Sequence, residues 1–227
     1  MAAQCFGTIK SKVARLTRLD ACGAPVVGPD TTVVTNGYIS IDVSPQYEDG
    51  SPARIMNAWG DLIANEVDDP TFLGANVTIT ANKVDIATLD IVSDARQVLS
   101  GADPVGAVYA EGKVTTRFAV ETWTKVLGSD CAGGSQQYVY WLFPVLGNGR
   151  LGDLTLGAEA ASFVLSGSTL AAPANTWLAG ATPATTGDPY SQSYLPANAS
   201  IAAGDHFYFG LTTVAPPTAA CGAVALA

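Results

Sequence analysis

Residues 138–143 read Tyr-Val-Tyr-Trp-Leu-Phe, a run of aromatic and aliphatic side chains without a charge. A short run that is apolar at both odd and even positions is typical of a β-strand covered on both faces, at the centre of a sheet. The preceding segment, 113–126, alternates instead, which predicts a strand with an apolar and a polar face. The apolar face is Val114, Phe118, Val120 and Val126, and the other carries Arg117, Glu121 and Lys125, with Trp123 among them.

Most of the remaining chain is also patterned as short strands. Further runs occur at 31–43 (two runs around Asn36-Gly37), 54–59, 75–80, 105–110, 153–156, 160–170 and 207–209. Asn-Gly between apolar runs indicates a hairpin, although 31–43 also fits one bent strand with a bulge. A helix is predicted after Asp85, a good N-cap residue, because Ile86, Leu89 and Val92 recur at helical spacing. We predict a mainly β fold, a single β-sandwich or barrel-like domain over 1–227 with one flanking α-helix.

Charge divides the chain into a basic start and an acidic remainder. Residues 1–18 contain four bases and no acid, whereas the whole chain has 11 bases, 20 acids and a net charge of −9. The four bases are Lys10, Lys12, Arg15 and Arg18. Unlike charges on one molecule favour self-association. We therefore interpret 1–30 as an extended N-terminal arm whose bases contact neighbouring subunits, with a solvated N-terminal strand as the alternative.

Two more segments depart from the strand pattern. Residues 44–70 contain six acids and one base, which predicts a long acidic loop of the kind that commonly carries function. Its candidates for facing a channel or a basic partner are Glu48, Asp49, Asp68 and Asp69. Residues 171–227 are rich in alanine and proline and are expected to form a largely irregular C-terminal segment.

Groups suited to catalysis or metal binding are few. The single histidine, His206, follows Asp205; a hydrolase would pair such residues with a nucleophilic serine, but no G-x-S-x-G motif is present. Neighbouring carboxylates at 48–49 and 68–69 suit a glycosidase or a Ca²⁺ site only in a defined geometry, and no Ca²⁺-loop pattern accompanies them. The four cysteines include no C-x-x-C pair, so a zinc site is not indicated. We expect no enzyme activity, no cofactor and no metal.

The acidic balance also narrows the partners and the location. A pI near 4.3 argues against a nucleic-acid binder that grips phosphates. The sequence has no run of 18 apolar residues that would span a membrane and no apolar N-terminal segment typical of a signal peptide. We therefore expect synthesis in the cytoplasm, reduced cysteines and no membrane span.

The order of several short motifs resembles a known family. The most telling are the E-T-W-T-K-V-x-G-x-x-C stretch at 121–131, the Y-x-Y-W-L-F-P stretch at 138–144 and the P-P-x-x-x-C-G close at 216–222. Together with VTNGYISIDVSPQYEDG (34–50), NAWGDL (57–62) and VGAVYAEG (105–112), they resemble the major tail proteins, or tail tube proteins, of long non-contractile-tailed (siphovirus-type) phages of actinobacteria.

This resemblance implies a structural virion protein. Members of the family are expected to form six-membered rings that stack into a hollow tail tube, built around a tape-measure protein and bounded by tail terminator and baseplate proteins. DNA then passes through the tube during ejection without specific binding. The resemblance places the chain in the phage tail, after synthesis in the host cytoplasm, with 44–70 bridging one ring to the next. An all-β binding or adhesion module on a virion or cell surface is the alternative from another class.

Overall fold

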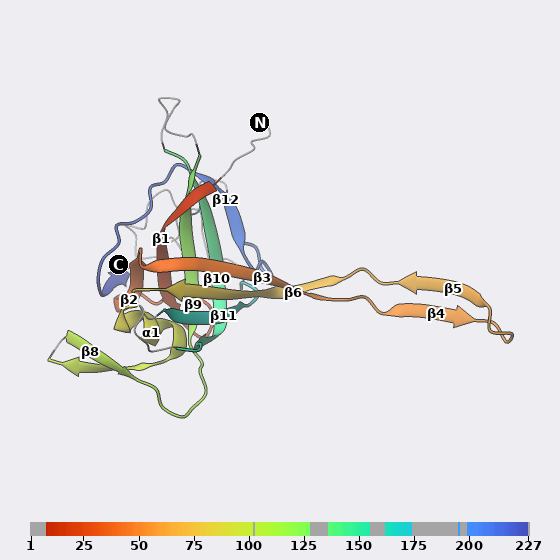
Figure 1. Cartoon of the computed structure of the whole chain (residues 1–227), viewed down its shortest axis with the longest axis horizontal. Helices are drawn as coiled ribbons and strands as arrows, with labels where there is room; N and C mark the ends of the chain where they lie inside the picture. Colours follow the sequence, from red (N-terminus) through yellow and green to blue (C-terminus); the bar gives the residue numbers. More distant parts are fainter. Residues whose placement is uncertain are drawn as a thin grey trace.

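The computed structural model describes residues 8–101, 103–127, 136–154, 162–173, 195 and 199–226. These residues form mainly antiparallel β-sheet with one helix, which confirms the prediction of a mainly β fold (Figure 1). The strands are β1 (Thr8–Leu19), β2 (Gly28–Thr35), β3 (Tyr38–Glu48), β4 (Pro52–Met56), β5 (Leu62–Val67), β6 (Thr71–Ala81), β7 (Arg96–Ser100), β8 (Asp103–Val108), β9 (Arg117–Val126), β10 (Tyr138–Leu151), β11 (Phe163–Thr169), β12 (Tyr208–Thr212) and β13 (Ala223–Leu226), and the helix is α1 (Ile86–Ser93).

One large sheet organises the body of the protein. Its strand order is β13-β2-β1-β9-β10-β11-β6-β3, and β12 pairs with β10 outside that path. The first part of β10 lies between β9 and β12, and its last residues pair with β11. The apolar run at 138–143 is therefore in a central strand, as predicted.

The sheet curls so that its edge strand β3 folds back toward the middle. The hydroxyl of Tyr38 in β3 lies 3.1 Å from Oγ1 of Thr122 in β9, although three strands separate β3 from β9 in the sheet order. The turn at Asn36-Gly37 makes this arrangement, since it joins β2 to β3 without pairing them. The Asn-Gly signal thus marks a turn between two strands, but neither the expected hairpin nor a single bent strand.

Apolar cores lie on both faces of the sheet. The first fills the inside of the curl, where Ile91 and Val92 of α1 pack against residues such as Phe118 and Phe143. The second lies on the opposite face, where Trp123 and Tyr140 pack against Leu195, Ile201 and other C-terminal residues. The predicted polar face of 113–126 is therefore wrong over β9, because Glu121 and Trp123 are both fully buried.

The helix begins where the sequence predicts. Asp85 is its N-cap, and the Asp85 carboxylate accepts a hydrogen bond from the backbone N–H of Ala87 at 3.0 Å. The same carboxylate accepts from the N–H of Gly222 at 2.5 Å. One acidic side chain therefore caps the helix and fixes the chain just before β13. No helix in the described ranges is long and apolar enough to cross a membrane.

Three of the expected irregular segments differ in the structure. Residues 8–19 form β1, which lies inside the sheet between β2 and β9, so the described part of 1–30 is not an extended arm. Residues 44–70 are not a loop: β3 continues to Glu48, and β4 and β5 form a hairpin. The C-terminal segment contributes β12 and β13 as well as cover for the second core. The strand expected at 153–156 is absent from 152–154, and the rest of it lies outside the described residues.

Candidate assembly surface

A long β-ribbon projects from the body of the protein, and we call it the arm (residues 47–72). Figure 1 shows it leaving the sheet as the continuation of β3 and β6 and ending in the hairpin β4–β5. β3 and β6 stay paired as far as Glu48 and Thr71, and β4 and β5 then pair from Pro52–Val67 to Met56–Leu62. The arm is therefore built almost entirely of paired strands.

The tip of the arm is closed by the side chain of Asn57. Its Oδ1 accepts hydrogen bonds from the N–H groups of Trp59 at 3.0 Å and Asp61 at 2.7 Å, and its Nδ2 donates to the Asp61 carboxylate at 3.1 Å. Gly60 has a φ of 86°, which favours glycine at that position. This defined turn presents the indole of Trp59, which is 91% exposed.

Both faces of the arm carry exposed aliphatic side chains. Cross-strand pairing places Pro52 beside Val67 on one face and Ile55 beside Ala64 on the other. The exposed large apolar residues of the hairpin are Ile55, Met56, Trp59, Leu62, Ile63 and Val67. A two-stranded ribbon has no core in which to bury such side chains and is at best marginally stable alone. Contiguous exposed apolar surface marks an interaction site.

A glycine fixes the narrowest point of the arm. A Cβ on Gly50 would lie 1.7 Å from the carbonyl oxygen of Asp68. The two chain segments approach too closely there for any side chain, since real Cβ atoms keep at least about a van der Waals contact distance. The absence of a side chain at Gly50 thus allows the two segments to approach closely between the β3–β6 section and the β4–β5 section.

The four predicted acidic residues gather near this narrow point. Glu48, Asp49, Asp68 and Asp69 are all exposed, and none forms an ion pair with a residue that the structure describes. Asp61 and Glu66 add negative charge nearer the tip, and Arg54 is the one base between residues 47 and 72. The arm therefore combines an apolar hairpin with a cluster of acidic residues near the point where it leaves the sheet.

The four predicted basic residues are not equivalent. Lys10 is exposed, and the side chain of Lys12 lies outside the described part of the chain. Arg15 is buried and forms an ion pair with Glu121, its cross-strand partner in β9. The other oxygen of Glu121 accepts from the Tyr140 hydroxyl at 2.5 Å.

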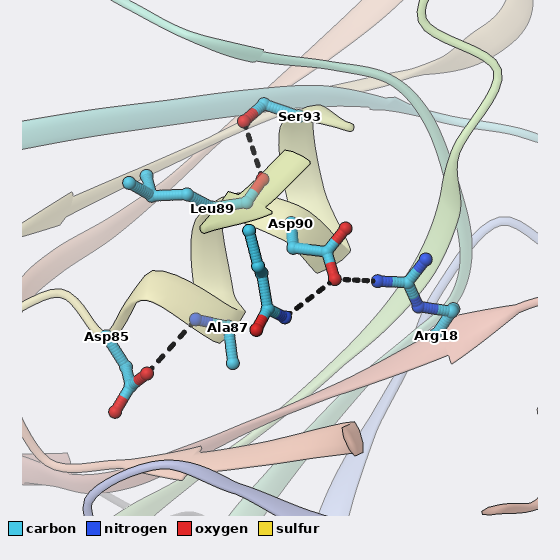
Figure 2. A network of polar contacts seen from close by, with 7 residues as sticks. Arg18, Asp85, Ala87, Leu89, Asp90 and Ser93 are labelled. Atoms are coloured by element: carbon cyan, nitrogen blue, oxygen red, sulfur yellow. Dashed lines mark hydrogen bonds and ion pairs between the residues drawn. The ribbon is translucent and has the colours of Figure 1, made fainter. Parts of the chain in front are cut away.

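Arg18 is also engaged within the chain. Figure 2 shows its guanidinium reaching from β1 to Asp90 of α1, at 2.6 Å. The amide of Gln97 in β7 donates to the same carboxylate at 2.8 Å. Both guanidinium groups therefore hold elements of one chain together. Buried Arg15 is not available to a neighbouring subunit, whereas the contact expected of Arg18, whose side chain is 26% exposed, stays a prediction.

The sequence predicts only one strand of a second hairpin, which β7 and β8 form. β8 corresponds to the strand expected at 105–110. Its partner β7 shows no clear strand pattern, because Arg96 and Gln97 are followed by only two apolar residues. The exposed apolar residues of this hairpin are Val98, Leu99, Val105 and Val108. Two hairpins with exposed apolar side chains thus leave the body on different sides (Figure 1).

The side chains of His206 and Asp205 do not bind each other but have separate hydrogen-bond partners. His206 Nδ1 lies 2.9 Å from Oγ1 of Thr169, and the Asp205 carboxylate accepts from the N–H of Ala202 at 2.7 Å. Within the described residues, no three His, Cys, Asp or Glu side chains cluster as metal ligands. Among the described residues, the arm is therefore the surface with the clearest features of an interaction site.

Neither a protein-family model nor any curated protein matches this sequence. The functional interpretation therefore depends on the residues and on the architecture that they form.

Proposed function

We propose that this chain is a structural subunit of a phage tail tube, which assembles with copies of itself into stacked rings around a hollow channel. The observation that carries the proposal is the arm: a ribbon with a hydrogen-bonded turn at its tip and exposed apolar side chains on both faces, which projects beyond its own core. A monomer leaves this surface in water, whereas a neighbouring copy can bury it. The motif order at 118–131 and 138–144 supplies the family, the six-membered ring and the passage of DNA by resemblance alone.

Head-to-tail contacts explain why such an arm would form a tube. A contact between unlike surfaces does not saturate in a dimer; it closes into a ring or repeats along an axis. The arm is one such surface, and a groove or sheet face on the next subunit would cover its apolar side chains. We propose that the arm bridges successive rings, which retains the bridging role expected of 44–70 although the segment is a hairpin.

Charge supports a channel that DNA passes without binding. The chain is strongly acidic, and the acids at the root of the arm have no described ionic partner. Carboxylates facing a channel would repel phosphates at close range. Among the bases proposed for inter-subunit contacts, Lys10, Lys12 and Arg18 remain candidates, and buried Arg15 does not. Tape-measure, terminator and baseplate proteins would be the further partners of such a tube.

A binding or adhesion module is the second candidate function, favoured by the exposed Trp59 at the end of the arm. The two candidates differ in assembly: a tube subunit grows into long particles, whereas an adhesion module stops at a small oligomer. Negative-stain electron microscopy over a range of concentrations separates them. Hollow tubes of constant diameter are expected, and small particles under all conditions would count against the tube.

Arm variants connect that morphology to the proposed surface. Ile55→Asp with Ile63→Asp places charge on both faces of the ribbon and is expected to abolish tubes while the monomer stays folded. Val27→Asp changes an exposed aliphatic residue on the body, 47% exposed against 59% for Ile55 and 66% for Ile63, and serves as the control. Normal tubes from the double variant would show that the arm is not the assembly surface.

A further inference from the structure

The arm leaves the body of the protein at a cluster of aromatic rings. Tyr47 and Phe72 are cross-strand partners with ring centroids 5.5 Å apart, in an edge-on arrangement. Phe72 also meets His206 at 5.3 Å and Phe207 at 6.3 Å, again edge-on. Phe207 lies 6.0 Å from Phe143 of the main core. A continuous path of ring contacts therefore runs from the arm into the core.

The sheet changes its pairing at the same place. β11 pairs with β6 as far as Ser168–Asn76, and beyond that point β6 keeps only β3 as a neighbour. Thr169 replaces the missing strand, because its Oγ1 accepts from the N–H of Ala75 at 2.7 Å. The same hydroxyl forms a hydrogen bond with His206 Nδ1, 2.9 Å away. A side chain from β11 and one from the C-terminal segment thus finish the sheet where the ribbon begins.

The backbone of β6 is bent at this point. Gly74 pairs with Gln46 and Phe72 pairs with Tyr47, so Leu73 is an extra residue on one strand, which is the arrangement of a β-bulge. Gly74 has a φ of 141°, and a Cβ there would lie 3.0 Å from Thr169 Oγ1 and 3.2 Å from the His206 ring. Glycine therefore allows His206 to sit directly against the bend.

His206 is itself held by a short turn. The carbonyl oxygen of Asp205 accepts from the N–H of Ala172 at 2.9 Å, and the N–H of Gly204 donates back to the Ala172 carbonyl at 2.9 Å. The Asp205 carboxylate closes the turn by accepting from Ala202. The imidazole thus approaches the arm from a fixed support.

We propose that His206, Phe207 and Thr169 form a clamp that fixes the direction in which the arm leaves the sheet before any partner is bound. Without the clamp, a bulged two-stranded ribbon would bend freely at Gly74. A surface held in its binding orientation loses less conformational freedom on association, so it binds more tightly. The clamp itself is a property of the single subunit; its role in assembly rests on the proposed function.

Distances measured across the clamp in the unassembled protein test this proposal. All four cysteines are replaced by serine, and spin labels are attached at Ala64→Cys in β5 and Asp42→Cys in β3, both exposed positions. Pulsed electron-spin measurements then give the distribution of distances between arm and body. We expect one narrow peak for the parent protein and loss of that peak in Phe72→Ala and in His206→Ala.

Matched variants separate the clamp from general damage to the arm. Trp59→Ala removes a larger ring from the same arm, far from the clamp, and should keep the narrow peak. His206→Asn keeps a polar group near the position of Nδ1 and should restore part of the peak lost in His206→Ala. A narrow peak in both Phe72→Ala and His206→Ala, with circular dichroism unchanged, would overturn the clamp.

Electron microscopy of the same proteins tests the role in assembly. We expect the clamp variants, Phe72→Ala and His206→Ala, to need a higher protein concentration to form tubes than the parent protein does. Normal tubes from a variant with a broad distance distribution would overturn that role. A narrow, clamp-dependent peak in a parent protein that never forms tubes would instead uphold the clamp and refute the proposed function.

Discussion

Replacing Arg15 by methionine is expected to destabilise the free subunit strongly. Arg15 is 4% exposed and Glu121 is fully buried, so Arg15→Met leaves a carboxylate in the core without its guanidinium. Removing one partner of a buried ion pair costs about 3–5 kcal/mol of unfolding free energy. That is a large part of the roughly 5–15 kcal/mol by which a typical domain is stable.

A further change at Glu121, the other member of the ion pair, separates the cost of a buried carboxylate without its guanidinium from the cost of lost packing. In Arg15→Met/Glu121→Gln the buried charge is gone, and the amide oxygen of glutamine can still accept from the Tyr140 hydroxyl. The double variant is therefore expected to recover much of the stability lost in Arg15→Met. Glu121→Leu in its place would recover less, because it removes the acceptor that residue 121 offers to the Tyr140 hydroxyl, and removing one partner of a buried hydrogen bond costs about 1–3 kcal/mol.

Urea unfolding at concentrations too low for assembly measures these differences. With a slope of about 2–3 kcal/mol per molar urea, Arg15→Met should lower the midpoint by about 1–2 M. A midpoint within about 0.3 M of the parent, which at this slope is under 1 kcal/mol, would refute the reasoning. So would a double variant no more stable than Arg15→Met, because the cost would then not come from the carboxylate that has lost its guanidinium.

Three further predictions concern the helix cap, the second core and the arm. Asp85→Ala removes the cap of α1 and the acceptor of Gly222, and should cost about 1–2 kcal/mol in urea unfolding, with Asp85→Asn restoring part of it; no loss would contradict the capping role. Burial raises the pKa of the Tyr208 phenol above its usual 10.0; the unfolded chain therefore loses this proton first as the pH rises, unfolding free energy falls above about pH 10, and Tyr208→Phe should flatten that fall, whereas parallel curves would refute it. Gly50→Ala should speed hydrogen exchange in 52–67 and prevent tubes while changing global stability by less than about 0.5 kcal/mol; Gly112, with open space around its Cα, provides the neutral Gly112→Ala control.

The sequence predicts local structure where neighbouring residues alone decide it. The apolar run at 138–143 indicates a doubly covered strand because its pattern has no polar period, and β10 is central. Asp85 indicates a helix start because a cap is made within three residues, and the Asp85–Ala87 bond is present. The turn at Asn36-Gly37 is also local, but the partners of the strands on either side are not.

Sequence reasoning fails where the partner is distant in the chain. Arg15 resembles an exposed base until Glu121, 106 residues later, is placed beside it in the sheet. Glu121 and Trp123 resemble a polar face until Leu195 and Ile201 cover it. Residues 44–70 resemble a loop because they are rich in acids and lack a regular apolar–polar alternation. The hairpin instead has exposed apolar side chains on both faces. The charges of 1–18 and 44–70 are visible in the sequence, but which of them are buried or paired depends on the tertiary fold.

Photo-crosslinking from position 59 tests the proposed assembly most directly. Trp59 is 91% exposed in the single subunit, and in a tube held together by its arms this position would lie against another copy. With a benzophenone side chain in place of Trp59, illumination of the purified, concentrated protein should produce covalent multiples of the 23.3 kDa chain. The same side chain at Val27, on the body, should give far fewer. Equal yields from both positions, or no multiples from position 59, would contradict assembly through the arm.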